Sequence, residues 1–376
     1  MRVEPPVPAD VLAAIRAPLE GVGAIAADAP LLQPLNLLLD LAGEAMRARL
    51  FVVQAEGGAE FCLRPDFTVA IVRRHLQSGR AQARYGYQGA AFRAAGGTDR
   101  PEEFVQIGLE ALGEDGRAPE TADAEIADLA WRSATAGGRQ DLSLWLGDVA
   151  LFAAFIDTLG LAPALAGRLK RLAGRPRLLQ TELARANTGS SGDEGALTGL
   201  LAGLPADRAG ALLEEVWALA GIEPVGGRGP AEIAARLVRK AEAAAASALT
   251  ETQAAAIRAF MAIDEAPEPA LKTIGKLAGA RSDVLLQALE AWSRRLEALS
   301  RAVPTDRLRF TPALGHAFDY YDGLVFEVRS AALGADRPVA VGGRYDGLLT
   351  RLGGSGAARA VGCMVRPWRA WAGGET

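Results

Sequence analysis

The chain has 376 residues, of which 50% are hydrophobic and 23% are charged. This composition is typical of a soluble globular protein with a sizeable core, and it excludes a disordered chain or a small module held together by disulfides. The formal net charge of -4 provides no overall positive field for binding nucleic acid.

Metal ligands and long apolar segments are scarce. The soft metal ligands are Cys62, Cys363, His75 and His316, and their spacing matches no zinc site, so we expect no metal and no other cofactor. Residues 1–21 contain prolines and acidic side chains where a signal peptide needs an apolar segment. No window approaches about 18 uninterrupted apolar residues. We therefore expect a cytoplasmic protein that does not enter the membrane.

The first zone of the chain, residues 1–155, mixes helical patterns with short β-rich stretches. Stretches 50–53 and 60–63 have the composition of strands, and the sequence Glu56-Gly57-Gly58 between them is typical of a turn. This zone therefore predicts mixed α and β structure with antiparallel hairpins.

The middle and last zones differ in composition. Residues 156–300 are rich in Ala, Leu, Arg and Glu, with apolar residues three and four positions apart, which predicts a helical block. In residues 301–376 strand-like stretches return at 308–310, 323–329, 339–341 and 360–365. Because neither end zone is large enough to bury a sheet alone, we predict an α+β fold with one sheet built from both end zones and a helical insertion between them.

The first polar cluster lies between a predicted strand and a predicted helix. Residues 61–68, FCLRPDFT, end a strand at the proline, and residues 68–76 have a helical pattern. Asp66 and Thr68 therefore stand at a helix start, where such side chains commonly cap free backbone N–H groups. A role in capping and a role in ligand binding both remain open for these two residues.

The second cluster is a predicted strand pair over residues 86–110 with a glycine-rich turn. In the second strand Phe104, Gln106, Gly108 and Glu110 alternate, so they share one face of a sheet. Gln and Glu beside small residues leave a polar hollow, which costs free energy unless a ligand or water satisfies it. The alternative is that this face of the sheet lies against solvent.

Two further clusters follow the helical block. Residues 314–327 contain the turn signal Asp322-Gly323 between β-forming residues, which predicts a hairpin. Residues 342–346 read Gly-Gly-Arg-Tyr-Asp, and their glycines lack the spacing of a Rossmann fingerprint or a Walker loop. Neither cluster therefore indicates a known nucleotide-binding loop.

Taken together and in this order, the four clusters resemble the catalytic core of class II aminoacyl-tRNA synthetases, specifically that of histidyl-tRNA synthetase. The matching segments are 63–68, which resemble Leu-Arg-Pro-Glu-Gly-Thr, 92–93 with 104–110 (motif 2), 319–321 with 326–327 (the histidine-binding hairpin), and 342–346 with 362–369 (motif 3). The resemblance covers roughly 30–155 and 301–372, and no family motif is identified in the middle block. It implies an antiparallel sheet flanked by helices.

The resemblance also implies a pocket for free histidine. An α-ammonium group needs hydrogen-bond acceptors, and an imidazole needs a partner at each ring nitrogen. The residues expected to bind histidine are Asp66, Thr68, Arg100, Gln106, Glu110, Tyr320 and Tyr321. In the resembling synthetases one arginine of motif 2 and one of motif 3 hold the ATP phosphates; these positions are Arg93 and Arg369 here, which we expect to be vestigial.

Departures from the synthetase pattern predict that no catalytic residues remain. His316 stands where the synthetase has an arginine that contacts the activated carboxylate, so a titrating imidazole replaces a fixed cation. Pro367 and Trp368 place bulk where ATP needs close backbone approach, and Ala94-Ala95 replace the polar pair of the motif 2 loop. Because the chain ends soon after Arg369, we expect no anticodon-binding domain and no binding of tRNA.

A histidine pocket without an activation site resembles the regulatory subunit of ATP phosphoribosyltransferase, a paralogue of the synthetase. The resemblance implies a non-catalytic protein that supports a short-form catalytic subunit at the first step of histidine biosynthesis and takes part in feedback regulation by histidine. It also implies a homodimer of the core within a hetero-oligomer, expected to be a hetero-octamer, with residues 29–41 as the candidate self-interface. Two alternatives stay open: a diverged amino-acid-activating enzyme, because the arginines and the acidic pocket are retained, and a scaffold whose pocket is vestigial.

Overall fold

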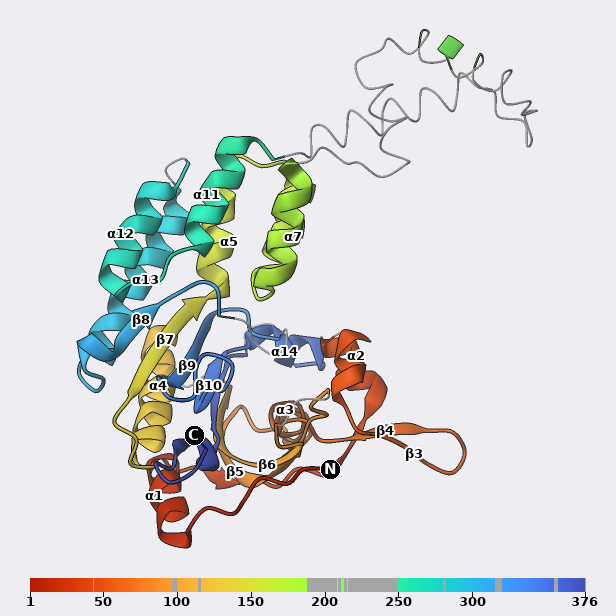
Figure 1. Ribbon diagram of the computed structural model, residues 1–376, viewed down its shortest axis with the longest axis vertical. Helices are drawn as coiled ribbons and strands as arrows, with labels where there is room; N and C mark the ends of the chain where they lie inside the picture. The colour runs from red at the N-terminus through yellow and green to blue at the C-terminus, as the bar shows by residue number, and fades with distance from the viewer. Residues whose placement is uncertain are drawn as a thin grey trace.

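The computed structural model describes residues 1–42, 44–96, 100–113, 116–187, 249–279, 282–314, 320–354 and 358–375, together with 208, 211, 212 and 215. An eight-stranded sheet runs through the middle of the molecule, helices pack against it, and a three-stranded sheet lies at one side (Figure 1). Among these residues, no helix combines the length and the apolar character needed to cross a membrane.

The eight-stranded sheet is antiparallel through its centre and mixed at its edges. Its strands, in spatial order, are β1 (Ile25–Ala26), β5 (Gln82–Phe92), β6 (Glu103–Gly113), β11 (Ala360–Val365), β10 (Ala340–Arg344), β9 (Leu324–Ser330), β7 (Leu142–Asp148) and β8 (Leu308–Phe310). β1 runs parallel to β5, and β8 runs parallel to β7. The remaining neighbours are antiparallel, as expected from the resemblance.

Strands from distant parts of the chain meet in this sheet. β6 lies beside β11, with Glu110 opposite Gly362 in the register. The predicted strand pair within residues 86–110 is confirmed by the antiparallel pairing of β5 and β6. The strands predicted at 308–310 and 360–365 coincide with β8 and β11. One continuous surface therefore carries residues of the second and the fourth polar clusters.

Helices cover one face of the sheet and extend beyond one edge. α4 (Pro119–Thr135) packs on β9, β10 and β11, and both α1 (Ala9–Glu20) and α13 (Asp283–Leu299) pack on α4. Among the described residues, the chain between β7 and β8 also forms α5 (Val149–Asp157), α6 (Pro163–Lys170), α7 (Pro176–Asn187), α11 (Glu251–Met261) and α12 (Pro267–Leu277). In Figure 1, α5, α7, α11 and α12 gather beyond the β7–β8 end of the sheet. A capping box of Thr250 and Gln253 fixes the start of α11.

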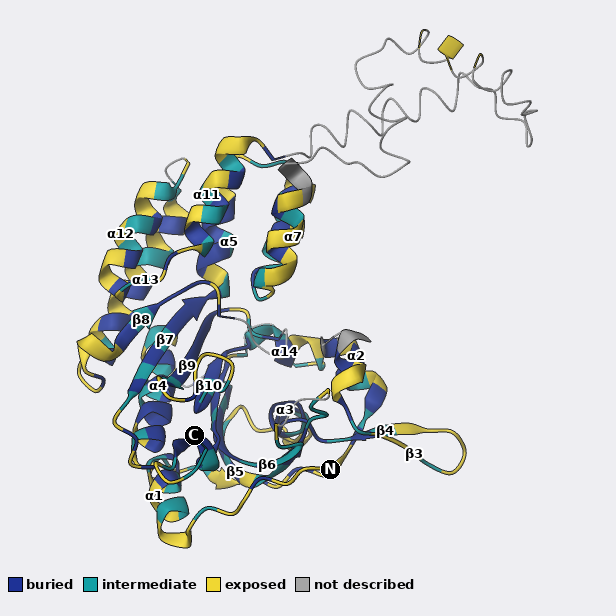
Figure 2. Cartoon of the chain, viewed as in Figure 1, coloured by how far each residue is buried: buried dark blue, intermediate teal, exposed yellow. Residues whose placement is uncertain are grey.

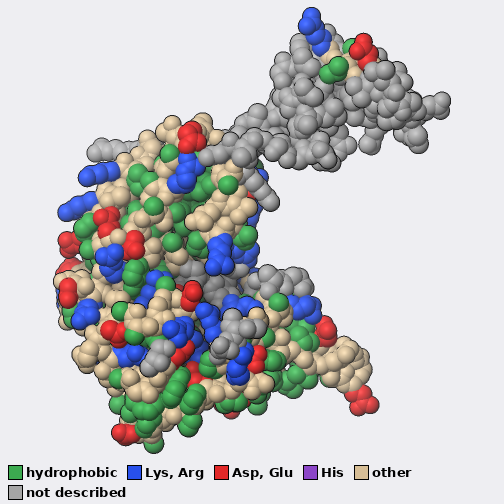
Figure 3. Space-filling view, viewed as in Figure 1, with side chains coloured by type: hydrophobic (Ala, Val, Ile, Leu, Met, Phe, Trp, Pro, Cys, Tyr) green, Lys and Arg blue, Asp and Glu red, His purple; other side chains and the backbone are tan. Residues whose placement is uncertain are grey.

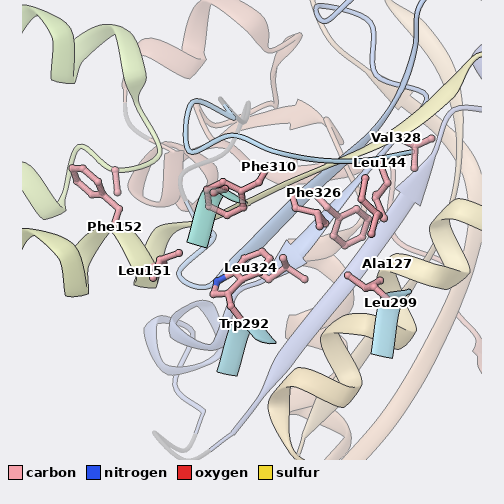
Figure 4. Close-up of a cluster of buried hydrophobic side chains, with 14 of the residues drawn as sticks. Ala127, Leu144, Leu151, Phe152, Trp292, Leu299, Phe310, Leu324, Phe326 and Val328 are labelled. Atoms are coloured by element: carbon pink, nitrogen blue, oxygen red, sulfur yellow. The ribbon is translucent and has the colours of Figure 1, made fainter. Parts of the chain in front are cut away.

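The main hydrophobic core joins these helices to the sheet. Phe155 stacks on Phe260 with ring centroids 4.6 Å apart, and Trp292 meets Phe310 edge-on at 5.3 Å. The close-up in Figure 4 shows Trp292 and Phe310 beside Leu324, at the start of β9. Buried residues follow the strands and the inward faces of the helices (Figure 2). Aromatic packing between helices and strands therefore holds the helical part against the sheet.

The smaller sheet consists of β2 (Leu32–Pro34), β4 (Glu60–Leu63) and β3 (Val52–Gln54). β3 and β4 form the predicted hairpin, and at its turn Gly57 and Gly58 have φ values of 90° and 85°, a backbone region that favours glycine. α2 (Leu35–Ala42) packs on this sheet and on the 3-10 helix Glu44–Arg49. α3 (Thr68–Ser78), at the position of a predicted helix, packs on β6.

The hairpin predicted over residues 314–327 is wrong in its described part. Tyr320 and Tyr321 lie outside any strand, and β9 pairs with β7 and β10. Asp322 instead accepts hydrogen bonds from the backbone N–H groups that open α14 (Asp346–Arg351). The Asp-Gly pair thus caps a neighbouring helix, a long-range role that a local turn signal does not reveal.

Candidate functional site

All nine residues assigned to a ligand pocket from the sequence line one cavity of about 1420 Å³. They are Asp66, Thr68, Arg93, Arg100, Gln106, Glu110, Tyr320, Tyr321 and Arg369. Residues of β6, β7, β9, β10 and β11 line this cavity, on one face of the sheet. Figure 3 shows Lys and Arg side chains around the hollow in the middle of the molecule. The cavity therefore gathers side chains from four separate stretches of sequence.

Glu110 is the acid at the centre of the hydrogen bonding in this cavity. It is 2% exposed; its Oε1 accepts a hydrogen bond from Thr68 Oγ1 at 2.7 Å, and its Oε2 accepts one from the hydroxyl of Tyr345. Burial raises the pKa of Glu110 to about 8, although both hydroxyl donors act in the opposite direction. The carboxyl group therefore holds its proton at neutral pH.

The raised pKa of Glu110 predicts that stability falls as the pH rises. The unfolded chain loses this proton near 4.5, whereas the folded chain keeps it until about pH 8. Between these values the folded state binds more protons than the unfolded state, so the contribution of Glu110 to the free energy of unfolding falls by up to about 1.4 kcal/mol per pH unit. In urea unfolding, the free energy of unfolding of Glu110→Gln is expected to decline less steeply with pH than that of the wild type between about pH 5 and pH 8. Equal slopes for the two proteins would contradict this assignment.

Two glycines make room for the buried side chains of the cavity. A Cβ atom on Gly362, opposite Glu110 in the register, would overlap Glu110 Oε2. A Cβ atom on Gly108 would overlap the hydroxyl of Tyr87, whose ring stacks on Phe67 with centroids 4.5 Å apart. Close approach of side chains therefore requires glycine at both positions.

Gln106 and Asp66, which both line the cavity, have polar atoms without a hydrogen-bond partner among the described residues. Gln106 is 0% exposed, and both its carboxamide oxygen and its nitrogen lack a hydrogen bond. Asp66 Oδ1 is also unpartnered, while its Oδ2 accepts a hydrogen bond from the hydroxyl of Tyr320 at 3.4 Å. Burial raises the pKa of Asp66 to about 6. Such atoms cost free energy unless a ligand or water satisfies them, so they mark a place where a polar ligand fits.

The structure distinguishes between capping and a place in the cavity for Asp66 and Thr68, the two residues at the start of α3. No side chain bonds to the backbone from the N-cap position of α3, which is Phe67, and the Thr68 hydroxyl donates to Glu110 instead. Backbone N–H groups at the start of α3 do act on the Asp66 carboxylate and lower its pKa against the effect of burial. Asp66 therefore combines a capping contact with a place in the cavity, whereas Thr68 serves the cavity alone.

Two tyrosines of the site were not predicted from the sequence. Tyr345 is 1% exposed, donates to Glu110 and lies 5.6 Å, ring to ring, from Tyr320. Its only signal was its place in the Gly-Gly-Arg-Tyr-Asp cluster. Tyr87 lines the same cavity opposite Gly108 in the register, and its signal was its position in a strand with alternating aromatic residues. Together with Tyr321, these rings form an aromatic wall around the polar groups.

Arginines gather elsewhere in the cavity. The guanidinium carbons of Arg93 and Arg366 lie 5.5 Å and 3.6 Å from the centroid of the Phe104 ring. Arg366 and Arg369 each pair with a carboxylate of the same chain. Arg366 was not among the predicted site residues, although it directly precedes a proline that was singled out.

Two predicted features lie at or beyond the margin of the described site. Arg100, expected to bind histidine, is 47% exposed and lies 3.9 Å from Asp336. It therefore stands at the rim of the cavity rather than among the buried polar groups. His316, expected to replace a catalytic arginine, lies outside the described residues.

A buried ion-pair network connects the strands of the cavity to the helices. Asp123 of α4 is 0% exposed and lies 2.7 Å from Arg295 of α13 and 2.7 Å from Arg344 of β10. Arg344 directly precedes Tyr345, whose hydroxyl reaches Glu110. The network therefore fixes the backbone that carries a side chain of the site.

Comparison with known proteins identifies the fold and the family. The chain matches the histidyl-tRNA synthetase family model over residues 21–222 and 230–367, which includes much of the helical block. A solved structure titled ATP phosphoribosyltransferase regulatory subunit/histidyl-tRNA synthetase, from Bacillus halodurans, superposes with a TM-score of 0.64 at 20% identity, covering 95% of this chain and 76% of that one. A histidine–tRNA ligase subunit from Alicyclobacillus acidocaldarius gives a TM-score of 0.57 at 22% identity, covering 98% and 95%. At these identities the two structures establish a shared fold.

Two relatives with closer sequences carry the name ATP phosphoribosyltransferase regulatory subunit. The protein of Mesorhizobium japonicum is 37% identical over 351 residues, which cover 90% of this chain and 91% of the relative. The protein of Brucella anthropi is 35% identical over 365 residues, covering 94% of each. The chain therefore belongs to the ATP phosphoribosyltransferase regulatory subunits, within the histidyl-tRNA synthetase family.

Proposed function

We propose that this chain is the non-catalytic regulatory subunit of an ATP phosphoribosyltransferase, a glycosyltransferase complex that carries out the first step of histidine biosynthesis in the cytoplasm. The chain supports a short-form catalytic subunit, which transfers a phosphoribosyl group onto ATP. Two relatives at 35% to 37% identity bear the corresponding name over nearly their full length, which supports this role.

The ligand of the cavity is free histidine, and it regulates the complex by feedback. The observation that carries this assignment is the set of unpartnered buried atoms on Gln106 and Asp66, beside Glu110. Carboxylate and carboxamide oxygens accept from an α-ammonium group, and Glu110 with Tyr321 can serve the two imidazole nitrogens. A ligand with one cationic group and one ring that both donates and accepts matches these partners.

The absence of catalysis is supported by how the arginines are used. Arg369 donates to Glu375 at 2.8 Å, and Arg93 donates to the backbone oxygen of Pro65 at 2.9 Å. In the resembling synthetases these two positions hold ATP phosphates. With their donors directed to groups of the same chain, the cavity binds histidine without activating it, and the protein handles no tRNA.

The core pairs as a homodimer within a hetero-octamer. In this proposal residues 1–155 and 301–376 form one core, and residues 156–300 form a helical insertion. Leu35 and Leu38 of the candidate self-interface are buried in the chain's own core, whereas Leu31 and Leu32 are 51% and 47% exposed. The exposed pair is therefore the part of that segment available for self-association.

Co-expression with a short-form catalytic subunit tests this function. We expect the two chains to co-purify, the catalytic subunit to be inactive alone, and the complex to be active and inhibited by histidine. An active catalytic subunit that does not bind this chain would overturn the proposal. Histidine-dependent exchange of pyrophosphate into ATP by this chain alone would favour a diverged activating enzyme instead. An active complex in which this chain binds no histidine would favour the scaffold.

A further inference from the structure

A pair of buried charges holds the first residues of the chain against the wall of the cavity. The side chains of Glu4 and Arg366 pair and are 2% and 6% exposed. The second carboxylate oxygen of Glu4 accepts a hydrogen bond from the backbone N–H of Val105 at 3.2 Å. Arg366 lines the cavity and stacks on Phe104. Both oxygens of Glu4 are thus engaged, and its charge neutralises a guanidinium that faces the cavity.

A second ion pair, between Arg369 and Glu375, lies near the other end of the described chain. Arg369 Nε donates to Glu375 Oε2 at 2.8 Å, and Arg337 lies 3.4 Å from the other oxygen. Burial opposes ionisation of Glu375, but Arg369 and Arg337 hold its pKa below the ordinary value. The backbone carbonyl of Glu375 accepts a hydrogen bond from Arg139, which fixes the segment in place. Glu375 is therefore a charged, anchored partner of Arg369 at neutral pH.

The part of the cavity around Arg366 and Arg369 carries the hydrogen-bond donors that a phosphate group needs. The arginines that line the cavity include Arg49, Arg93, Arg100, Arg366 and Arg369. Guanidinium groups bind phosphate through paired N–H donors, as they bind carboxylate. A carboxylate that already occupies these donors competes with phosphate and repels it. Nε of Arg366 has no hydrogen-bond partner among the described residues, so this guanidinium retains capacity for a further acceptor.

We propose that Glu4 and Glu375 act as internal substitutes for phosphate and exclude polyphosphate anions, such as nucleoside triphosphates, from the arginine-lined part of the cavity. This inference rests on the proposed function, because a pocket that reports histidine in a complex acting on ATP must not fill with ATP. It assigns the selectivity to two carboxylates rather than to loss of the arginines. Removing their charges opens the cavity to pyrophosphate and ATP.

Calorimetric titration with inorganic pyrophosphate and with ATP tests the inference. Glu4→Gln/Glu375→Gln is expected to bind either anion about tenfold or more tightly than the wild type, and each single variant is expected to bind with intermediate affinity. Adding Arg369→Gln to the double variant is expected to remove most of this gain. The matched control is Glu297→Gln, on α13, which removes a carboxylate that is 70% exposed and pairs with Arg301. This control is expected to gain no affinity for either anion.

Equal pyrophosphate affinity in the wild type and the folded double variant would overturn the inference. Near-ultraviolet circular dichroism establishes whether each variant is folded. If the double variant does not fold, the comparison of Glu375→Gln with the wild type tests the inference, because this single variant keeps the contact between Glu4 and Arg366. Histidine titrated into the same samples separates the two proposals. A wild type that binds no histidine contradicts the proposed ligand, whereas a gain of pyrophosphate binding in the variants still supports the role of the two carboxylates.

Discussion

Glu110→Ala is expected to weaken histidine binding by roughly 5- to 150-fold, which corresponds to about 1–3 kcal/mol for leaving buried hydrogen-bonding groups without a partner. The substitution removes the acceptor that faces the ligand and leaves the hydroxyls of Thr68 and Tyr345 without their shared partner. Calorimetry on the purified chain measures the change in Kd, and inhibition of the complex by histidine measures its regulatory effect. Co-purification with the catalytic subunit is expected to be unchanged.

Tyr321→Phe is expected to weaken the response to histidine in the same way, because it removes one partner of the imidazole.

The control for Glu110→Ala is Glu125→Gln. Glu125 lies on α4, is partly buried, pairs with Arg84 at 2.7 Å and is not among the residues that line the cavity. This variant is expected to bind histidine with nearly wild-type affinity. If Glu110→Ala retains wild-type affinity, feedback histidine binds elsewhere in the complex and the ligand assignment fails.

Asp123→Ala is expected to lower the free energy of unfolding by about 3 kcal/mol, because it removes the carboxylate that two buried guanidinium groups share. Among the described residues, Arg295 then keeps only Asp148, at 3.7 Å, and Arg344 keeps only Asp346, at 3.0 Å, as a carboxylate partner. Asp123 is the counter-charge of both Arg295 and Arg344, whose side chains are 8% and 9% exposed. Guanidinium groups do not lose their protons at neutral pH, so these two cations stay charged in the interior. Urea unfolding monitored by circular dichroism measures the loss.

Asp128→Ala, on the same helix, provides the comparison for Asp123→Ala. Asp128 pairs with Arg132 one turn away at 2.9 Å, and the Arg132 side chain is 51% exposed. Removing such a surface pair is expected to cost less than about 1 kcal/mol. Similar losses in the two variants would show that the buried network contributes no more than a surface ion pair.

Local periodicity was sufficient to predict the polar face of β6. Alternation along one strand depends only on the chain itself, so Phe104, Gln106 and Glu110 could be assigned to one face before any neighbour was known. All three line the cavity. The two-glycine turn between β3 and β4 was predictable for the same reason, since residues on either side of a short loop must pair with each other.

Contacts that depend on strand order could not be predicted in this way. Tyr345 reaches Glu110 because β11 lies between β6 and β10 in the sheet, and nothing in the local pattern of any of these strands predicts that order. The pairing of Arg366 with Glu4 joins opposite ends of the chain and was equally invisible. The Asp322-Gly323 turn signal misled because its carboxylate was needed by a helix distant in sequence.

The pairing of β6 with β11 has a consequence for how the protein is made. The β5–β6 hairpin is synthesised before the strand that covers the open edge of β6, and the helical block separates the two in the chain. Until then β6 exposes unpaired backbone groups, which favour pairing with other chains, and contacts over such long sequence separations form slowly. A nascent chain thus carries Gln106 and Glu110 long before Gly362 and Tyr345 can join them. Ligand binding at this site would therefore report that synthesis and folding of the whole sheet are complete.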